Sequence, residues 1–235
     1  AGLGFRAVSE NSMDAVSDRD WSAELVFAGG LLGVHLSRLA EDLVVFSSRE
    51  FGFVRIGDDH STGSSLMPQK RNPDVAELVR GKAGRLIGNV VGVLTLLKGL
   101  PAGYNRDLQE EKAILFDTVD ALAIALPALT GALRNTSYRP DRITEALDPE
   151  LLATDLADYL VKAGVPFRES HEILGGLVRE AEERGVPLSG LPDDVFGKAH
   201  AAFTEGFRAI FDWERSVEVR DTAGGTSRRA VQAQI

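Results

Sequence analysis

The side chains best suited to chemistry in this sequence lie close together in residues 63–74. These residues read Gly-Ser-Ser-Leu-Met-Pro-Gln-Lys-Arg-Asn-Pro-Asp, so the hydroxyls of Ser64 and Ser65 lie near the Lys70 ammonium and the Asn72 amide along the chain. A loop on a rigid scaffold can aim such side chains, together with its own backbone N–H groups, at a ligand. We therefore expect the chemistry of this protein in this loop.

Long helical patterns flank the loop and must position it. Apolar residues recur at spacings of three and four over residues 21–48, which predicts one helix spanning about 42 Å at 1.5 Å per residue. A second apolar series over residues 75–97 predicts another helix, with Pro73 suited to its first turn. A third helix is predicted from about residue 106 to 133, where Pro127 should cause a kink or a break.

Glycines in the first long helix predict close packing against a neighbour. Gly29, Gly30 and Gly33 would each weaken an isolated helix by roughly 1 kcal/mol relative to alanine. Their clustering therefore favours a helix that approaches another one closely. Helices of this length, spaced by polar loops, are typical of a long-helix bundle.

The pattern changes after the third helix. Beyond Tyr138-Arg139-Pro140 the helical pieces become shorter and are separated by Gly-Pro-rich turns, and no period-two strand pattern of useful length is seen. We predict an all-α chain with a boundary near Asn135. Residues 1–135 would form part of a central helical bundle that carries the loop at 57–74, and residues 136–235 a smaller C-terminal helical domain.

Composition narrows the class of protein without identifying it. The 235 residues include 35 acidic and 26 basic residues, giving a net charge of −9, and no block is rich in Lys and Arg. This balance disfavours nucleic acid and anionic membrane as partners. The sequence has no cysteine, which excludes disulfides and thiolate metal sites. No uninterrupted apolar run approaches the roughly 20 residues of a membrane span, so a cytoplasmic protein is expected.

The loop resembles the signature of the fumarase/aspartase superfamily, Gly-Ser-Ser-x-Met-Pro-x-Lys-x-Asn-Pro, at every fixed position. At the variable positions, Gln69 and Arg71 are similar to the argininosuccinate lyase branch. Fumarases and aspartases usually carry Gly and Val there, and adenylosuccinate lyases usually carry His before the lysine. Residues 3–20 and 103–112 fit the same family, so the resemblance covers nearly the whole chain.

The resemblance implies a reaction and an assembly. The reaction is reversible β-elimination of argininosuccinate to arginine and fumarate in arginine biosynthesis, with neither cofactor nor metal. The assembly is a homotetramer whose active sites combine segments of three subunits. The resemblance also places this sequence in the C-terminal half of a longer polypeptide, whose other half would supply an N-terminal domain and a segment with a catalytic histidine.

The resemblance also assigns roles to residues of the loop. It implies that Ser64 is the base, that Lys70 and the substrate-binding Asn72 stabilise the enediolate intermediate, and that Glu77 orients the catalytic histidine of the other half. Asn11 is a weaker candidate near the site. Further positions match family residues of the site: Tyr104, Gln109 and Lys112 for binding the amino-acid part of the substrate, and Arg19 as a second weaker candidate.

A serine hydroxyl needs help to act as a base. It ionises well above the tyrosine value of about 10. An ammonium at about 4 Å contributes roughly 4 kcal/mol at an effective dielectric of about 20, or about three pKa units, so Lys70 alone is insufficient. We expect the remainder from backbone N–H groups around residues 63–65 and from exclusion of water when the loop closes.

Ordinary structural roles compete with each of these assignments. Ser64 could be a turn residue, Lys70 part of an exposed basic pair, and Tyr104 a packing aromatic. Asp74 and Glu77 have capping-box spacing. Lys112 could instead form a helical ion pair with a neighbour three or four residues away.

Other functions also stay open. Asp58-Asp59-His60 invites a metal reading, but adjacent residues do not easily converge on one ion, so we expect no metal. His60 stands where the family usually has Tyr or Phe, which bears on the hinge of the loop. The alternatives to an argininosuccinate lyase are an adenylosuccinate lyase-like enzyme and a non-catalytic helical scaffold of the crystallin kind.

Overall fold

The chain forms two compact units, which divide after Thr144. The computed structural model describes residues 2–67, 69–204 and 206–235, so Pro68 of the loop signature lies outside the described residues. The division falls later than Asn135 because strand β4 (Thr136–Tyr138) pairs with strand β1 (Val54–Ile56) of the first unit.

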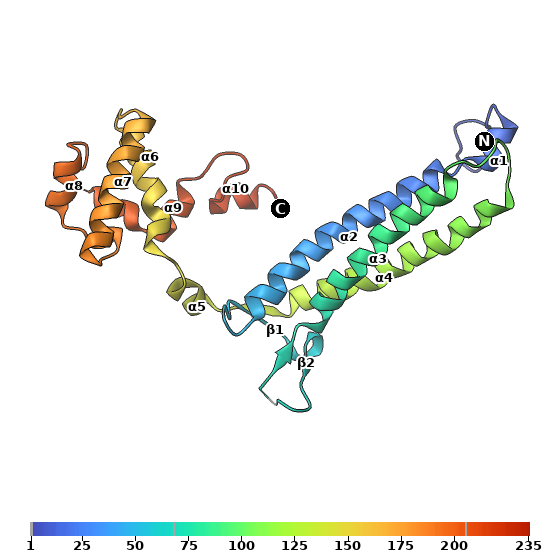
Figure 1. The fold of residues 1–235 in the computed structure, drawn as a ribbon, viewed down its shortest axis with the longest axis horizontal. Helices are drawn as coiled ribbons and strands as arrows, with labels where there is room; N and C mark the ends of the chain where they lie inside the picture. The colour runs from blue at the N-terminus through green and yellow to red at the C-terminus, as the bar shows by residue number, and fades with distance from the viewer. Residues whose placement is uncertain (1, 68, 205) are drawn as a thin grey trace. The chain divides into compact units, whose positions relative to one another are not determined.

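Three long helices make up most of the first unit. Helices α2 (Asp20–Ser47), α3 (Asp74–Leu97) and α4 (Glu111–Arg134) lie side by side, and each runs antiparallel to the helix that precedes it (Figure 1). Their bounds confirm the predicted helices closely. Of the kink or break predicted at Pro127, the break is absent, since α4 continues through it, with Ala125 and Leu129 buried on either side. Packing on both sides of the proline offsets the hydrogen bond that it cannot donate.

The glycines of α2 lie where its neighbours approach. A Cβ added to Gly30 would lie 2.7 Å from Val90 Cγ2 of α3, and one on Gly29 would lie 2.6 Å from Thr118 Cγ2 of α4. Both distances are shorter than van der Waals contact, so the backbone of α2 packs directly against side chains of both neighbours. The close approach predicted from the glycine cluster is present.

The bundle leaves much of its apolar surface exposed. On α2 the inward face consists largely of small residues, whereas Trp21 is 55% and Leu25 48% exposed. We call the exposed apolar side chains of the three long helices the apolar stripes. They include Trp21, Leu25, Phe27 and Leu31 of α2, Leu78, Ile87, Val91 and Leu94 of α3, and Phe116, Val119 and Ile124 of α4. Exposed apolar surface on this scale marks contacts with further protein or with membrane.

Two helical segments, α2 and residues 106–134, are long and apolar enough to cross a membrane by length and composition alone. Both carry acidic side chains along their length, such as Glu24 and Glu41 in α2 and Asp117 and Asp120 in α4. Both also pack against other bundle helices. We therefore read both segments as helices of this bundle and not as membrane spans.

Two short antiparallel ladders close one end of the bundle. Strand β1 pairs with β4 from Val54 opposite Tyr138 to Ile56 opposite Thr136. Strand β2 (Thr62–Gly63) pairs with β3 (Arg71–Asn72). Each strand has two or three residues, too few for an alternating pattern, which explains why the sequence did not predict them.

The second unit is a small helical domain with its own core. Its main helices are α6 (Ala153–Lys162), α7 (Phe167–Arg184), α8 (Asp193–Ala199), α9 (Trp213–Glu218) and α10 (Arg228–Gln232), and the short helix α5 (Pro140–Glu145) links the two units. Phe196 is fully buried, and the guanidinium of Arg208 lies 4.9 Å from its ring centroid. The described residues therefore confirm the all-α fold class.

Candidate active site

The candidate loop projects from the bundle beyond the β2–β3 ladder (Figure 1). The ladder places Thr62 opposite Asn72 and Gly63 opposite Arg71, which brings the two ends of the loop together. The Thr62 hydroxyl donates a hydrogen bond to the carboxylate of Asp74, and Arg71 forms an ion pair with Asp58. The base of the loop is therefore fastened to the start of α3, while residues between the two strands extend outward.

Ser64 lies at the start of the loop with its hydroxyl in a nest of backbone donors. Its Oγ accepts hydrogen bonds from the N–H groups of Leu66, at 3.2 Å, and Met67, at 3.1 Å. This is the geometry of a serine turn, and the same two donors stabilise negative charge on Oγ. The sequence anticipated donors around residues 63–65, whereas those that reach Oγ belong to the two residues that follow.

The other residues assigned to the loop surround its base. Lys70 is exposed, and its N–H donates to the Met67 carbonyl at 2.9 Å. Asn72 is half-buried in β3. Glu77 is exposed in the first turn of α3, and it adds to a rise in the pKa of Arg80 that comes mainly from a hydrogen bond to Glu41.

The capping-box alternative for Glu77 is wrong. The N-cap of α3 is Pro73, which has no side-chain capping bond, and the Asp74 carboxylate is already engaged by Thr62. The N–H of Glu77 instead donates to the Pro73 carbonyl at 3.0 Å in an ordinary helical bond. The carboxylate of Glu77 therefore does not cap this helix, and the side chain is exposed on its first turn.

A second group of predicted residues lies where α4 begins. The amide nitrogen of Gln109 donates to the Tyr104 hydroxyl at 3.0 Å, so the structure brings these two residues together. Lys112 is exposed in the first turn of α4. Asn11 has a structural role, because its side chain accepts hydrogen bonds from the N–H groups of Met13 and Asp14 and caps helix α1 (Ser12–Ser17).

Arg19 is held by a buried acidic residue that the sequence analysis missed. Its Nε lies 2.6 Å from Oε2 of Glu111, whose side chain is only 4% exposed. Glu111 follows Leu108 by three residues and precedes Leu115 by four, which places it on the inward face of this segment. This helical spacing between two apolar residues was the sequence signal that could have identified Glu111 as buried. Beside the pair is a shallow cleft of about 260 Å³, lined by Ser17, Asp18, Arg19, Asp20, Leu97, Leu100, Pro101, Ala102, Gly103 and Leu108.

A single chain does not bring the two groups of residues together. The loop with Ser64 precedes the first turn of α3, and Tyr104, Gln109 and Lys112 follow its last turn. The 24 residues of α3 span about 36 Å at 1.5 Å per residue. In Figure 1 the two groups accordingly lie at opposite ends of the bundle. No amino-acid-sized ligand bridges this distance.

His60 packs at the base of the loop and not in a metal cluster. Its ring lies against Gly131 of α4, and its Nδ1 is 3.1 Å from the amide nitrogen of Asn135. Among the described residues no group of three or more His, Asp or Glu side chains could hold a metal ion. The adjacent Asp58 is engaged by Arg71.

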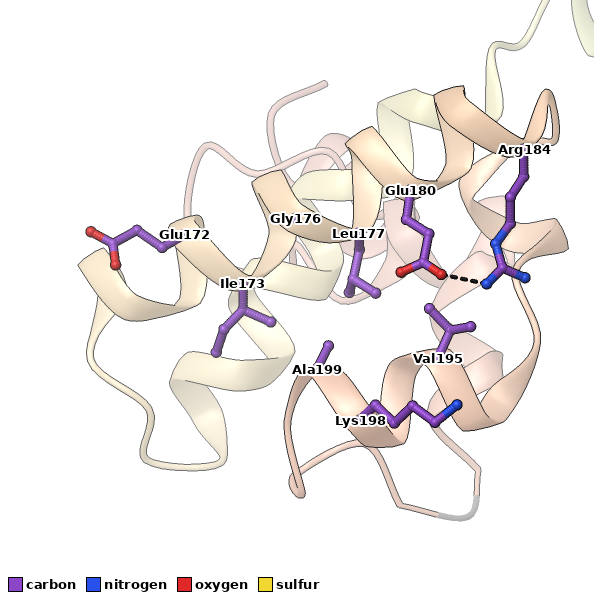
Figure 2. Close-up of a pocket in the computed structure, with 9 residues that line it drawn as sticks. All are labelled: Glu172, Ile173, Gly176, Leu177, Glu180, Arg184, Val195, Lys198 and Ala199. Atoms are coloured by element: carbon purple, nitrogen blue, oxygen red, sulfur yellow. Dashed lines mark hydrogen bonds and ion pairs between the residues drawn. The ribbon is translucent and has the colours of Figure 1, made fainter.

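A pocket of about 410 Å³ lies in the second unit, between α7 and α8 (Figure 2). Leu177 and Val195 contribute to its apolar floor, and Glu180, Arg184 and Lys198 lie around it. None of the residues of the loop signature lines this pocket. We therefore do not assign the chemistry to it.

Comparisons with known proteins agree with the geometry. Residues 1–88 match the family model described as "Lyase", and residues 150–218 match the one described as "Argininosuccinate lyase C-terminal". The chain is 58% identical over 233 residues to the argininosuccinate lyase of Roseiflexus sp. (strain RS-1), covering 99% of this chain and 51% of that protein. It is 53% identical to that of Chlamydomonas reinhardtii, covering 99% of this chain and 50% of that protein. The chain belongs to the argininosuccinate lyase family.

This membership confirms the resemblance seen in the sequence. The chain spans about half the length of the curated argininosuccinate lyases that it matches. Among solved structures, EDDS lyase in complex with formate superposes with a TM-score of 0.83 at 29% identity, over 98% of this chain and 48% of that one. A class II fumarase from Schistosoma mansoni has a TM-score of 0.68 at 20% identity, over 85% of this chain and 42% of that one, and supports the fold alone.

Proposed function

We propose that this chain supplies part of the active sites of an argininosuccinate lyase, which cleaves argininosuccinate to arginine and fumarate in arginine biosynthesis. The observation that carries the proposal is the hydroxyl of Ser64, which accepts two backbone N–H groups at the start of an exposed, cation-bearing loop. This arrangement favours the ionised hydroxyl that a base requires. The identity of 58% to a protein named argininosuccinate lyase supports the choice of substrate.

In the proposed reaction, ionised Ser64 takes the proton from the carbon next to a carboxylate of the substrate. The electron pair of that C–H bond moves into the carboxylate and forms a dianionic enediolate, which the Lys70 ammonium and the Asn72 amide stabilise. The pair then returns to form the carbon–carbon double bond of fumarate while the C–N bond breaks. The departing nitrogen takes a proton and leaves as part of arginine, in the step assigned to the histidine that Glu77 orients.

The site is proposed to form between copies of the chain. Ser64 and Tyr104 lie at opposite ends of a helix about 36 Å long, so a complete site needs groups from more than one chain. The apolar stripes offer the surface along which further helices would pack, and a homotetramer with composite sites satisfies both observations. Light scattering tests the assembly, since a monomer that turns over substrate contradicts it.

The substrate and the assembly are tested by one assay. This chain is assayed for fumarate release by ultraviolet absorbance, first alone and then mixed with the N-terminal half of the Roseiflexus relative. We expect turnover of argininosuccinate in the mixture only. Turnover of adenylosuccinate instead would reject the substrate, and a tetrameric mixture without activity would favour the scaffold alternative.

The proposed compartment is the cytoplasm, to be checked by fractionation of the cells.

The role of Ser64 is tested by comparing alanine variants of two neighbouring serines. Ser64→Ala should lower kcat by roughly 10²- to 10⁴-fold, the contribution of a general base, and leave substrate binding nearly unchanged. Ser65→Ala is the matched control, because it removes a neighbouring exposed hydroxyl that makes none of these bonds to Leu66 and Met67. Equal losses in the two variants would mean that loop shape matters and that the Ser64 hydroxyl does not take the proton.

A further inference from the structure

The entrance to the loop is fastened to α4 by the ring of His60. This residue ends the short 3-10 helix η1 (Asp58–His60), four positions before Ser64. A Cβ added to Gly131 of α4 would lie 3.2 Å from Cε1 and 3.3 Å from Cδ2 of the ring, and closer still to Nε2. The ring therefore occupies the space that any side chain at position 131 would need.

The cap of α4 completes this fastening. Asn135, the C-cap residue, accepts a hydrogen bond on its carbonyl from the Gly57 N–H at 2.8 Å, and its amide nitrogen lies 3.1 Å from His60 Nδ1. With that nitrogen as donor, the neutral ring carries its proton on Nε2. The N–H of His60 donates to the Gly57 carbonyl at 3.0 Å. Both ends of η1 are thus tied to the last turn of α4.

Beyond His60 in the chain, the hydrogen bonds and ion pairs of the described loop residues go to the loop itself and to α3, not to α4. The β2–β3 ladder joins the loop to itself through two residue pairs, and Thr62 joins it to Asp74 of α3. A two-stranded ladder of this length has little rigidity of its own. The contact of His60 with Gly131 and Asn135 adds a second helix to the support, so that α3 and α4 together fix the direction in which Ser64 enters the loop.

We propose that His60 is a positioning residue for the reaction, and that its ring, seated on Gly131, holds the loop entrance where Ser64 can take the proton. The inference rests on the proposed function of Ser64. His60 touches no reacting atom and acts through the backbone between positions 60 and 64.

A double-mutant cycle in the assembled enzyme tests the proposal. His60→Ala removes the ring and Gly131→Ala displaces it, so each should lower kcat by roughly 10- to 100-fold, the cost of a misplacement of about 1 Å, with KM changed less than kcat. The double variant should be no worse than the poorer single variant, because both changes break one contact. His60→Phe should restore most of the lost kcat. His171→Ala is the matched control, since His171 is exposed on α7 of the second unit.

Hydrogen exchange of the loop amides gives a readout that does not depend on turnover. Exchange at Leu66 and Met67 should speed up in His60→Ala and Gly131→Ala, and stay unchanged in the control. Suppose that the parent protein does not cleave argininosuccinate while the two variants still exchange faster than it does. That result would uphold the contact of His60 with α4 and reject the proposed function instead. Full multiplication of the two kcat losses in the double variant, or loop exchange equal to that of the parent, would overturn the inference.

Discussion

Removing the guanidinium of Arg19 should destabilise the first unit far more than removing an ordinary surface charge. Arg19 is the partner of Glu111 at 2.6 Å, and the two side chains are 18% and 4% exposed. Arg19→Met keeps an apolar stem of similar length but leaves the Glu111 carboxylate buried without its cation. The same guanidinium also donates to the Val16 and Asp18 carbonyls, so the turn into α2 loses bonds as well.

The expected cost follows from the burial of the pair. Breaking a buried ion pair by removing one partner costs about 3–5 kcal/mol, which is a large part of a total stability of about 5–15 kcal/mol. Replacing both partners by apolar residues, as in Arg19→Met with Glu111→Leu, should recover most of that loss because no charge stays buried. The matched control is Arg228→Met, since Arg228 and Glu214 are 74% and 69% exposed and should contribute less than about 1 kcal/mol.

Urea unfolding followed by fluorescence measures these costs in the unit concerned. The chain has two tryptophans, Trp21 in α2 of the first unit and Trp213 in α9 of the second, so a Trp213→Phe background makes Trp21 the reporter for the first unit. For the Arg228→Met control, which lies in the second unit, a Trp21→Phe background makes Trp213 the reporter. In the proposed enzyme Arg19→Met should also raise KM, because Gln109 and Lys112, which we propose to bind substrate, lie close to Glu111 in sequence. A loss below about 1 kcal/mol, or a double variant as unstable as the sum of the singles, would refute the reasoning.

Two further predictions concern packing and pH. Gly30→Ala should destabilise the first unit by about 1–2 kcal/mol, because its Cβ would lie 2.7 Å from Val90 and overpacking outweighs the gain in helix propensity. Gly175→Ala, which lies in open space on α7, should instead stabilise the second unit by about 0.5–1 kcal/mol. Urea unfolding measures both changes. The hydrogen bond from Ser227, and then the bond from Arg229, lower the pKa of Asp221 below its ordinary value of 3.8. The stability that these bonds give to α10 is therefore fully present above pH 3.8, and it is lost as the pH falls through the lower pKa of Asp221 in the folded state. Exchange of the α10 amides, corrected for intrinsic rate, should rise only in that acidic range, and Asp221→Asn should remove the pH dependence.

The sequence predicted the long helices well because their signal is repeated many times. Over residues 21–48 the apolar period recurs through several turns, and the observed helix Asp20–Ser47 differs by one position at each end. The continuity of α4 through Pro127 could not be predicted, because a single residue carries no repeated signal. One local penalty of about 3 kcal/mol is outweighed by burial of the flanking turns, which depends on neighbours that a local pattern does not reveal.

The sequence could name candidate residues of the site but not their contacts. The chemical types pointed to the loop, the family resemblance named Ser64 and Lys70, and the structure adds the two backbone donors that reach the Ser64 hydroxyl. The brace between Thr62 and Asp74 and the seat of His60 on Gly131 join positions far apart in the chain. Such pairings have no period and no composition signal, so only the folded chain shows them.

The two units differ in how far they bury their apolar side chains, and this difference has a consequence during synthesis of the polypeptide. The second unit hides Phe196 and Leu188 within itself, whereas the first leaves residues such as Phe27 and Leu94 more than half exposed. The first unit is synthesised before the second, and in the proposed assembly its exposed apolar side chains stay uncovered until other chains supply their helices. The recombinant chain should therefore aggregate at high concentration through its first unit, and chaperones or a co-expressed partner chain should improve its soluble yield.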